Sequence, residues 1–172
     1  TKGVFAELEY KANSNPAIAD IDKDGYPEII INDNKYLYAF EPNGSLIFKK
    51  GIGLIEGEVL PSASIGDLDG DGNLDITIKN SDSLYGFNYL GEKLANFPIK
   101  IGGLTRSPCI LADINEDSYL DIIFGSYDKK VYAVDKNGSI ISLFPFDTGE
   151  IISASPVITD LDDDNKSDLI VV

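Results

Sequence analysis

Four short clusters of acidic residues recur along this 172-residue chain and present the oxygen atoms that hard cations prefer as ligands. Within each nine-residue cluster, oxygen-bearing side chains stand at positions one, three, five and nine, and position seven is expected to offer its backbone carbonyl. The predicted ligands are Asp20, Asp22, Asp24, Tyr26 and Glu28; Asp67, Asp69, Asp71, Asn73 and Asp75; Asp113, Asn115, Asp117, Tyr119 and Asp121; and Asp160, Asp162, Asp164, Lys166 and Asp168. Calcium takes six to eight oxygens, which each set can supply with the help of water. The sequence therefore predicts about four bound Ca²⁺ ions, one for each cluster.

The loops differ from one another at the residues that shape the turn and carry charge. Glycine at position six permits a sharp turn and is present as Gly25 and Gly72, whereas Ser118 and Asn165 replace it in the third and fourth loops. Asn115 also replaces a charged ligand in the third loop, so this loop is predicted to bind calcium most weakly. The alternative for any single loop is an ordinary solvated turn, since Asp, Asn and Gly also form those.

An EF-hand loop shares the first half of this pattern but requires a glutamate at position twelve and two flanking helices. The residues at position twelve are Ile31, Ile78, Phe124 and Val171. The last carboxylate instead comes at position nine, and an apolar strand follows at once. The sequence therefore excludes an EF-hand and predicts that each ion joins two strands.

The clusters begin at Asp20, Asp67, Asp113 and Asp160, and this spacing of 46 or 47 residues indicates a structural repeat. Short apolar segments precede the loops at 16–19, 63–66, 109–112 and 156–159, and β-branched segments follow them at 29–31, 76–78, 122–124 and 169–172. Third strands are expected at 36–40, 84–87 and 131–134, and fourth strands at 46–48, 94–97 and 140–143. Between them, Asn43-Gly44 and Asn137-Gly138 predict type I′ turns.

Four strands in about 47 residues match one blade of a β-propeller, so the fold class is all-β, with four-stranded antiparallel blades. We expect one propeller domain or propeller segment over residues 1–172. Its repeats fall at about 1–13 (an outer strand), 14–60, 61–105, 106–152 and 153–172 (partial). Because the first segment aligns with an outermost strand and the last with a second strand, the propeller is predicted to be incomplete. It is either part of a longer chain or completed by a strand from a neighbour.

These repeats resemble those of the FG-GAP family, which are calcium-binding blades of integrin α-subunit propellers and of many microbial surface proteins. Phe124-Gly125 matches the Phe-Gly element of that family. The Gly-Ala-Pro element is reduced to Asn15-Pro16, Ser62-Ala63, Ser107-Pro108 and Ser155-Pro156. The resemblance implies that the Asp-x-Asp-x-Asp-Gly-x-x-Asp loops bind calcium. The third strands are also similar to quinoprotein-like propellers, but those lack the calcium loops, so the FG-GAP assignment is preferred.

Composition argues against several other functions. A formal net charge of −15 disfavours nucleic-acid binding, and no apolar run reaches the roughly 18 residues of a membrane span. The chain has no histidine, and its one cysteine, Cys109, lies in an apolar segment, so no Ser-His-Asp or Cys-His set can be assembled. Two carboxylates could still act as a glycosidase pair, but the best-placed ones are the predicted metal ligands. We therefore expect that the chain is not an enzyme.

The sequence favours a calcium-binding module at the cell surface or outside the cell, in adhesion, surface assembly or protein interaction, because loops of this kind fill at extracellular calcium levels. The alternative is a calcium-dependent glycan-binding accessory module of a secreted polysaccharide-acting enzyme, with Tyr89, Tyr119 and Tyr127 as candidate contacts. The expected partner is a protein or glycan at a cell surface. A homo-oligomer joined through exposed strand edges is a further expectation.

Overall fold

The computed structural model describes residues 6–12, 14–53, 61–80, 82–164 and 166–172, and its regular elements over these residues are all β-strands. Three four-stranded antiparallel sheets and one two-stranded hairpin follow one another along the chain. Their strands are β1 (Ala17–Ala19), β2 (Glu28–Asn32), β3 (Tyr36–Phe40) and β4 (Leu46–Gly51); β5 (Ser64–Gly66), β6 (Asp75–Lys79), β7 (Ser83–Phe87) and β8 (Ile99–Lys100); β9 (Ile110–Ala112), β10 (Asp121–Gly125), β11 (Lys130–Val134) and β12 (Phe146–Asp147); and β13 (Val157–Thr159) with β14 (Asp168–Ile170). The predicted all-β class and the four-stranded antiparallel blade are confirmed.

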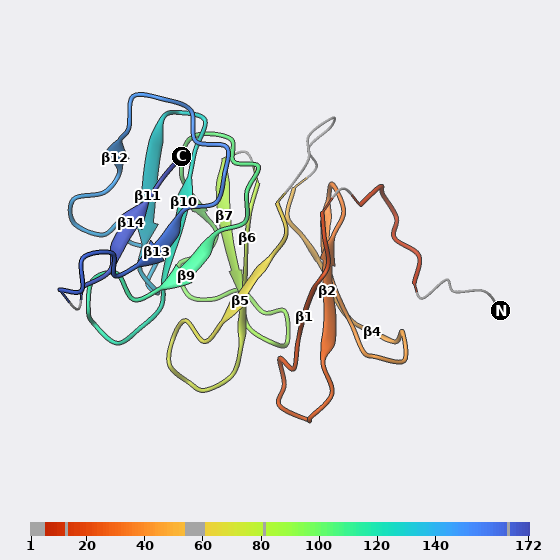
Figure 1. The fold of residues 1–172 in the computed structure, drawn as a ribbon. Helices are drawn as coiled ribbons and strands as arrows, with labels where there is room; N and C mark the ends of the chain where they lie inside the picture. Colours follow the sequence, from red (N-terminus) through yellow and green to blue (C-terminus); the bar gives the residue numbers. More distant parts are fainter. Residues whose placement is uncertain (1–5, 13, 54–60, 81, 165) are drawn as a thin grey trace.

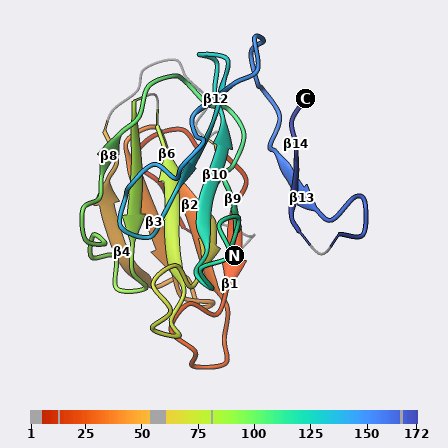
Figure 2. The same cartoon turned by 90° about the vertical axis from the view of Figure 1, so that its left-hand side faces the viewer.

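The sheets stand side by side in chain order, with the first sheet and the final hairpin at opposite ends of an open array (Figure 1). Strands β1 and β5 are in contact, and so are β5 and β9, so the short first strands of successive sheets are neighbours. The turned view shows β1 and β9 along one edge and β4 and β8 along the other (Figure 2). The small residues of the first strands, such as Ala17 and Gly66, allow this close approach.

Adjacent sheets are joined by apolar side chains that fill the space between them. Leu37 of β3 packs in one cluster with Phe87 of β7, and Leu84 packs in a second cluster with Phe124 of β10. All four of these side chains are buried. Burying one such side chain contributes about 1.5–3 kcal/mol, so these clusters hold the array together.

Polar contacts also link neighbouring sheets, at the short elements that precede the first strands. The backbone N–H of Asn15 donates to Ser62 Oγ at 3.0 Å, and Ser155 Oγ donates to the carbonyl of Pro108 at 3.1 Å. These residues belong to the reduced Gly-Ala-Pro elements of the sequence. The elements thus serve as repeated hydrogen-bonded contacts from one blade to the next.

The fourth strands of the second and third sheets do not lie where the sequence predicted them. Residues 94–97 form a turn in which Phe97 N–H donates to the Leu94 carbonyl at 3.1 Å, and Asn96 has a φ of 66°. Residues 141–144 repeat this turn, with Leu143 at a φ of 73°. The outer strands β8 and β12 start only after these turns. A positive φ at the third residue is typical of a type II turn, which the apolar pattern of these segments concealed.

The hairpin turns between the third and fourth strands also differ from the prediction. The N–H of Gly44 donates to the Glu41 carbonyl and the N–H of Glu41 donates to the Ser45 carbonyl, both at 2.9 Å. Gly44 has a positive φ of 87°, whereas Asn43 does not have a positive φ. This is a type I turn followed by a left-handed glycine, not the predicted type I′ turn. The turns at Gly91 and Gly138 repeat the same hydrogen bonds.

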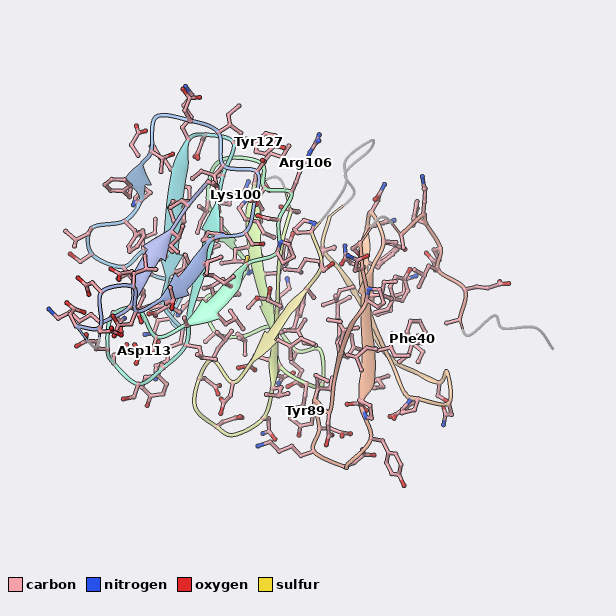
Figure 3. The ribbon with its side chains drawn as sticks, in the orientation of Figure 1. Phe40, Tyr89, Lys100, Arg106, Asp113 and Tyr127 are labelled. Carbon is pink, nitrogen blue, oxygen red and sulfur yellow. The ribbon has the colours of Figure 1, made fainter. Side chains whose placement is uncertain are left out.

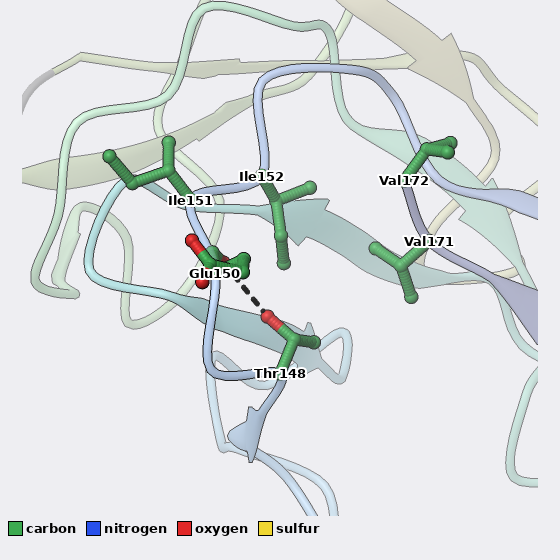
Figure 4. Close-up of a pocket in the computed structure, with 6 residues that line it drawn as sticks. All are labelled: Thr148, Glu150, Ile151, Ile152, Val171 and Val172. Carbon is green, nitrogen blue, oxygen red and sulfur yellow. Dashed lines mark hydrogen bonds between the residues drawn. The ribbon is translucent and has the colours of Figure 1, made fainter.

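The two ends of the array are built differently. Residues 6–12, which the sequence assigned to an outer strand, form no strand, and the N–H of Tyr10 donates to Asp33 Oδ2 at 3.2 Å; residues 1–5 lie outside the described residues. At the other end, a cavity of about 220 Å³ lies between the segment that follows β12 and the residues that follow β14 (Figure 4). Its lining consists of Thr148, Glu150, Ile151, Ile152, Val171 and Val172.

Candidate metal centre

The four acidic loops connect the first strand of each sheet to the second, and they lie on the same side of the array (Figure 1). Asp113 marks this side in Figure 3, and Tyr127, in the turn between β10 and β11, marks the opposite side. Because the first strands are neighbours, the loops are neighbours too. The repeat thus places the predicted ligands of the first three loops in one row.

The carboxylate at position nine closes each loop in the same way. Glu28 Oε2 accepts a hydrogen bond from the N–H of Ile21 at 2.8 Å, and Asp75 Oδ2 accepts one from Leu68 at 2.9 Å. The third and fourth loops repeat this bond from Ile114 at 3.0 Å and from Leu161 at 2.9 Å. A backbone donor at position two is therefore part of every loop; it is buried in the first two loops, partly buried in the third and exposed in the fourth. Sequence reasoning missed this role, although an apolar residue at position two of all four loops is its visible signal.

The remaining carboxylates fold the backbone of the loop around themselves. At position one, Asp20 Oδ2 accepts from Gly25 N–H at 3.0 Å and Asp67 Oδ2 accepts from Gly72 N–H at 2.9 Å. Position five accepts from position seven, at 2.8 Å in the bond from the Tyr26 N–H to Asp24 Oδ1. The N–H groups of Asn73, Tyr119 and Lys166 make the same bond. Each loop is thereby held in a curled form with its acidic groups converging.

Three of the four loops bring three carboxylates close enough to share one ion. In these loops one oxygen from each residue lies within 4.8 Å of the others, and the residues are Asp20, Asp22 and Glu28; Asp67, Asp69 and Asp71; and Asp160, Asp162 and Asp168. Asp24, Asp75 and Asp164 belong to the same loops but lie outside these closest sets.

The third loop forms no such group among the described residues. In this loop the amide nitrogen of Asn115 donates to Asp117 Oδ2 at 3.3 Å and to Asp121 Oδ1 at 3.4 Å. These bonds use carboxylate oxygens that an ion would otherwise take.

Two buried oxygens of the first loop have no hydrogen-bond partner, and this makes the loop fit a cation. Glu28 is fully buried, and its Oε1 atom and the Oδ1 atom of Asp20 are without partners. A buried carboxylate oxygen that is left unpaired is costly. The donor set, all oxygen and mostly carboxylate, suits a hard divalent cation such as Ca²⁺.

Burial also changes the acidity of the position-nine carboxyls. Burial raises the pKa of Asp75 to about 6, opposed by the hydrogen bond from Leu68 and reinforced by the charges of Asp69 and Asp71. Burial likewise raises the pKa of Asp121 to about 6, and it raises the pKa of Glu28 above its usual value. Without a cation these groups are costly to ionise, because burial disfavours their charged form.

The one cysteine, Cys109, is buried, and burial raises the pKa of its thiol to about 12.

No helix in the described part of the chain has the length and apolar character needed to cross a membrane.

Residues 20–78 match the model of the FG-GAP-like repeat, a stretch that includes the first and second acidic loops but less than half of the chain. No curated protein sequence matches the chain.

Among solved structures, the biofilm matrix protein Bap1 of V. cholerae is similar with a TM-score of 0.68 and 24% identity, over 91% of this chain and 23% of that one. BamB from Moraxella catarrhalis is similar with a TM-score of 0.58 and 16% identity, over 88% of this chain and 42% of that one. The computationally designed Ika4 protein has a TM-score of 0.58 and 9% identity, over 100% and 99% of the two chains.

This chain thus spans less than half the length of the two natural proteins, and the likeness concerns the fold. Together with the family match, the geometry leads to one conclusion: the chain carries FG-GAP-like repeat sequence at residues 20–78 within an array of β-propeller blades.

Proposed function

We propose that this chain is a calcium-binding β-propeller module that acts outside the cell in adhesion, surface assembly or protein interaction, and that it is not itself an enzyme. The observation that carries the calcium proposal is the fully buried Glu28 with its unpartnered Oε1, grouped with Asp20 and Asp22. Two unit charges 4.8 Å apart repel by about 3 kcal/mol at an effective dielectric constant of about 20. A divalent cation turns this repulsion into attraction.

The residues of each loop have separate roles in this proposal. The carboxylate at position nine starts the second strand, and its bond to the position-two N–H holds it at the end of the first strand. Carboxylates at positions one, three and five come from the loop between the two strands. An ion held by these groups would tie the first strand to the second in each sheet. The proposed role of calcium is therefore to stabilise the blades.

A general property of calcium loops and one comparison support the extracellular setting. Calcium loops of extracellular modules have dissociation constants of about 10⁻⁴–10⁻³ M, far above cytosolic calcium. One protein with a similar fold is described as a biofilm matrix protein. Both fit a module whose surface is presented to partner proteins outside the cell.

Thermal unfolding with and without calcium tests the proposal. A site at a hundredfold excess of ligand over its dissociation constant adds about 2.7 kcal/mol to the free energy of unfolding, so removing calcium with EGTA should lower the Tm sharply. Glu28→Gln should reduce the calcium-dependent part of this shift. Glu150→Gln, the same charge change at an exposed residue outside the loops, should preserve it. An identical melt in calcium and in EGTA would contradict calcium binding.

A second candidate function, glycan binding, is favoured by a different surface feature. A cavity of about 280 Å³ lies between the first loop and the hairpin turn of the same sheet, lined by Asp24, Tyr26, Glu41, Pro42 and Asn43. Tyr26 is 66% exposed, so its ring is free to pack against a sugar.

The three tyrosines named from the sequence lie in other surroundings. Tyr89 packs against the first core cluster, Lys136 lies over the ring of Tyr119, and Arg106 lies 5.6 Å from the ring of Tyr127. A glycan array probed with the unaltered chain and with Tyr26→Ala, each with and without calcium, tests this candidate. Calcium-dependent binding that Tyr26→Ala abolishes would favour a glycan module over a protein-interaction module.

A further inference from the structure

Position four of every loop has the left-handed backbone conformation, which the ligand spacing did not predict. Its φ is 62° at Lys23, 77° at Gly70, 62° at Glu116 and 60° at Asp163. Side chains other than glycine adopt this conformation at a cost of about 1–2 kcal/mol. Because three of the four loops accept that cost, the conformation alone does not explain why the second loop has glycine at this position.

Gly70 faces a tyrosine ring that belongs to the neighbouring loop. A Cβ atom on Gly70 would lie 2.7 Å from Cε1 and 3.2 Å from Cδ1 of Tyr119, well inside the usual carbon–carbon contact of about 3.5–4.0 Å. By contrast, a Cβ atom on Gly25, which stands at position six of the first loop, would meet nothing within 4 Å. The ring of Tyr119 therefore lies directly against the backbone of the second loop, in space that only glycine leaves open.

The third sheet holds this ring in place with a lysine. The ammonium nitrogen of Lys136, in the turn after β11, lies 2.8 Å from the centroid of the Tyr119 ring, as in a cation–π contact. Lys136 also lines a cavity of about 260 Å³ together with Asp69, one of the second loop's predicted ligands. Tyr119 and Lys136 thus form a wall for the second loop, although both belong to the next blade.

Tyr119 also occupies position seven of the third loop, where its own backbone carbonyl is a predicted ligand. An ion in the third loop would replace the Asn115 amide as the partner of Asp117 and Asp121, and it would fix this backbone and, with it, the ring against Gly70. A binding event that orders a shared element lowers the ordering cost of the second event, and the effect is reciprocal. We propose that the second and third loops bind calcium cooperatively, with Tyr119 as the positioning residue that couples them. This inference rests on the proposed function.

Calcium titrations of the full 172-residue chain, followed by NMR, test the coupling at a single site. The Gly72 amide reports on the second loop, because its N–H donates to Asp67 Oδ2 at 2.9 Å. Tyr119→Ala should raise the calcium concentration at the midpoint of the Gly72 titration about fivefold or more, the lower end of usual coupling energies. Tyr119→Phe keeps the ring and should restore the original midpoint. Tyr127→Ala, at the opposite end of the same sheet, should leave it unchanged.

A double-mutant cycle tests cooperativity itself. Asp117→Ala disables the third loop and should weaken calcium binding at the second loop in the unaltered chain, but not in the Tyr119→Ala chain. If Tyr119→Ala unfolds, Gly70→Ala tests the same contact from the other side. The added methyl group should weaken calcium binding at the second loop when Tyr119 is present and have little effect with the smaller Tyr119→Leu.

The possible results separate the two proposals. A Gly72 midpoint that Tyr119→Ala does not change overturns the coupling and leaves calcium binding intact. A Gly72 resonance that does not respond to calcium in the unaltered chain contradicts calcium binding at the second loop and, with it, this inference, whereas the proposed function fails only if the melt in calcium and in EGTA is identical as well.

Discussion

At the scale of single residues, the position-nine carboxylate is the clearest physical reason for the proposed cation. In the first loop, one oxygen of Glu28 is satisfied by the N–H of Ile21 and the other is buried without a partner. The backbone of Glu28 is held in the sheet, because the residue begins β2. A buried and half-satisfied carboxylate is costly to ionise in the calcium-free fold, and the proposed cation would remove that cost.

This arrangement predicts an unusual pH dependence for the calcium-free chain. The pKa of Asp75 is raised from 3.8 to about 6 by burial, and a carboxyl with a raised pKa stabilises the fold fully below its unfolded value. That stability is lost as the pH rises from about 4 through about 6, a difference of up to about 3 kcal/mol. In calcium-depleted buffer the Tm should therefore be higher at pH 5 than at pH 7.

Asp75→Asn supplies the control for this prediction, because its amide does not ionise. The variant should have a smaller difference in Tm between pH 5 and pH 7 without calcium, and it should lose stability relative to the unaltered chain when calcium is added at pH 7. A calcium-free Tm that rises steadily from pH 5 to pH 7 would show that the position-nine carboxyls are not destabilising.

The loops are also predicted to differ in strength. Asp71 belongs to a close group of three carboxylates, whereas Asp117 accepts a hydrogen bond from Asn115 and belongs to no such group among the described residues. Asp71→Ala should therefore reduce the calcium-induced rise in Tm more than Asp117→Ala does. The measurement is the difference in Tm between calcium and EGTA for each variant. Equal losses would refute the ranking.

At the scale of strands, the repeat made the first three strands of each blade predictable. Apolar alternation and the fixed distance to the acidic loop place β2, β6 and β10 within a residue or two of their expected positions. The fourth strands were only partly predictable, because residues 94–97 and 140–143 read as apolar strands but form turns after only brief pairing with the third strands. Phe97-Pro98 and Phe144-Pro145 were the available signals, since proline cannot donate to a strand ladder.

Contacts between blades were not predictable, because they join residues that share no local pattern. Lys79 is fully buried, and its ammonium donates to the carbonyl of Gly103, in the linker between β8 and the next blade, at 2.8 Å. Asn80 donates to the carbonyl of Ile52 in the linker before its own blade at 2.7 Å. Tyr119 likewise appeared in the sequence only as a ligand or a sugar contact, and its packing on Gly70 needed the fold.

One of these contacts gives a prediction at the scale of elements. Gly91, in the hairpin turn of the second sheet, packs on β4 of the first sheet, and a Cβ atom there would lie 2.6 Å from Phe48 Cγ. Gly91→Ala should lower the free energy of unfolding by about 2 kcal/mol or more, through the left-handed backbone and the overpacking together. Chemical denaturation in saturating calcium measures this loss.

Gly149→Ala is the matched control for Gly91→Ala. Gly149 also has a positive φ, of 79°, but a Cβ atom there would meet nothing within 4 Å. Its substitution should cost only the backbone term, about 1–2 kcal/mol. If the two variants lose the same stability, the contact between the hairpin turn and β4 contributes little to holding the sheets together.

At the scale of the whole molecule, the row of acidic loops follows from the blade architecture. Short first strands bring successive sheets together at one edge, so loops that begin there must also be neighbours. The sequence predicted the array and the number of loops. The proposed coupling of one loop to the next depends on how closely the sheets approach, which is set by side chains such as Leu111 that pack against Gly66.

The concentration of negative charge along this row predicts a salt dependence that calcium should reduce. The chain has a formal net charge of −15, and four calcium ions would reduce this to about −7. Self-repulsion destabilises the compact state most at low ionic strength, where the Debye length is about 30 Å at 0.01 M against about 10 Å at 0.1 M. The Tm of the calcium-free chain should therefore rise steeply as sodium chloride increases from about 0.01 M to about 0.3 M. In calcium the rise should be much shallower, because the closest charges are already neutralised. Replacing sodium by choline separates screening from weak sodium binding in the loops, and parallel salt curves with and without calcium would show that the charge repulsion does not lie at the proposed sites.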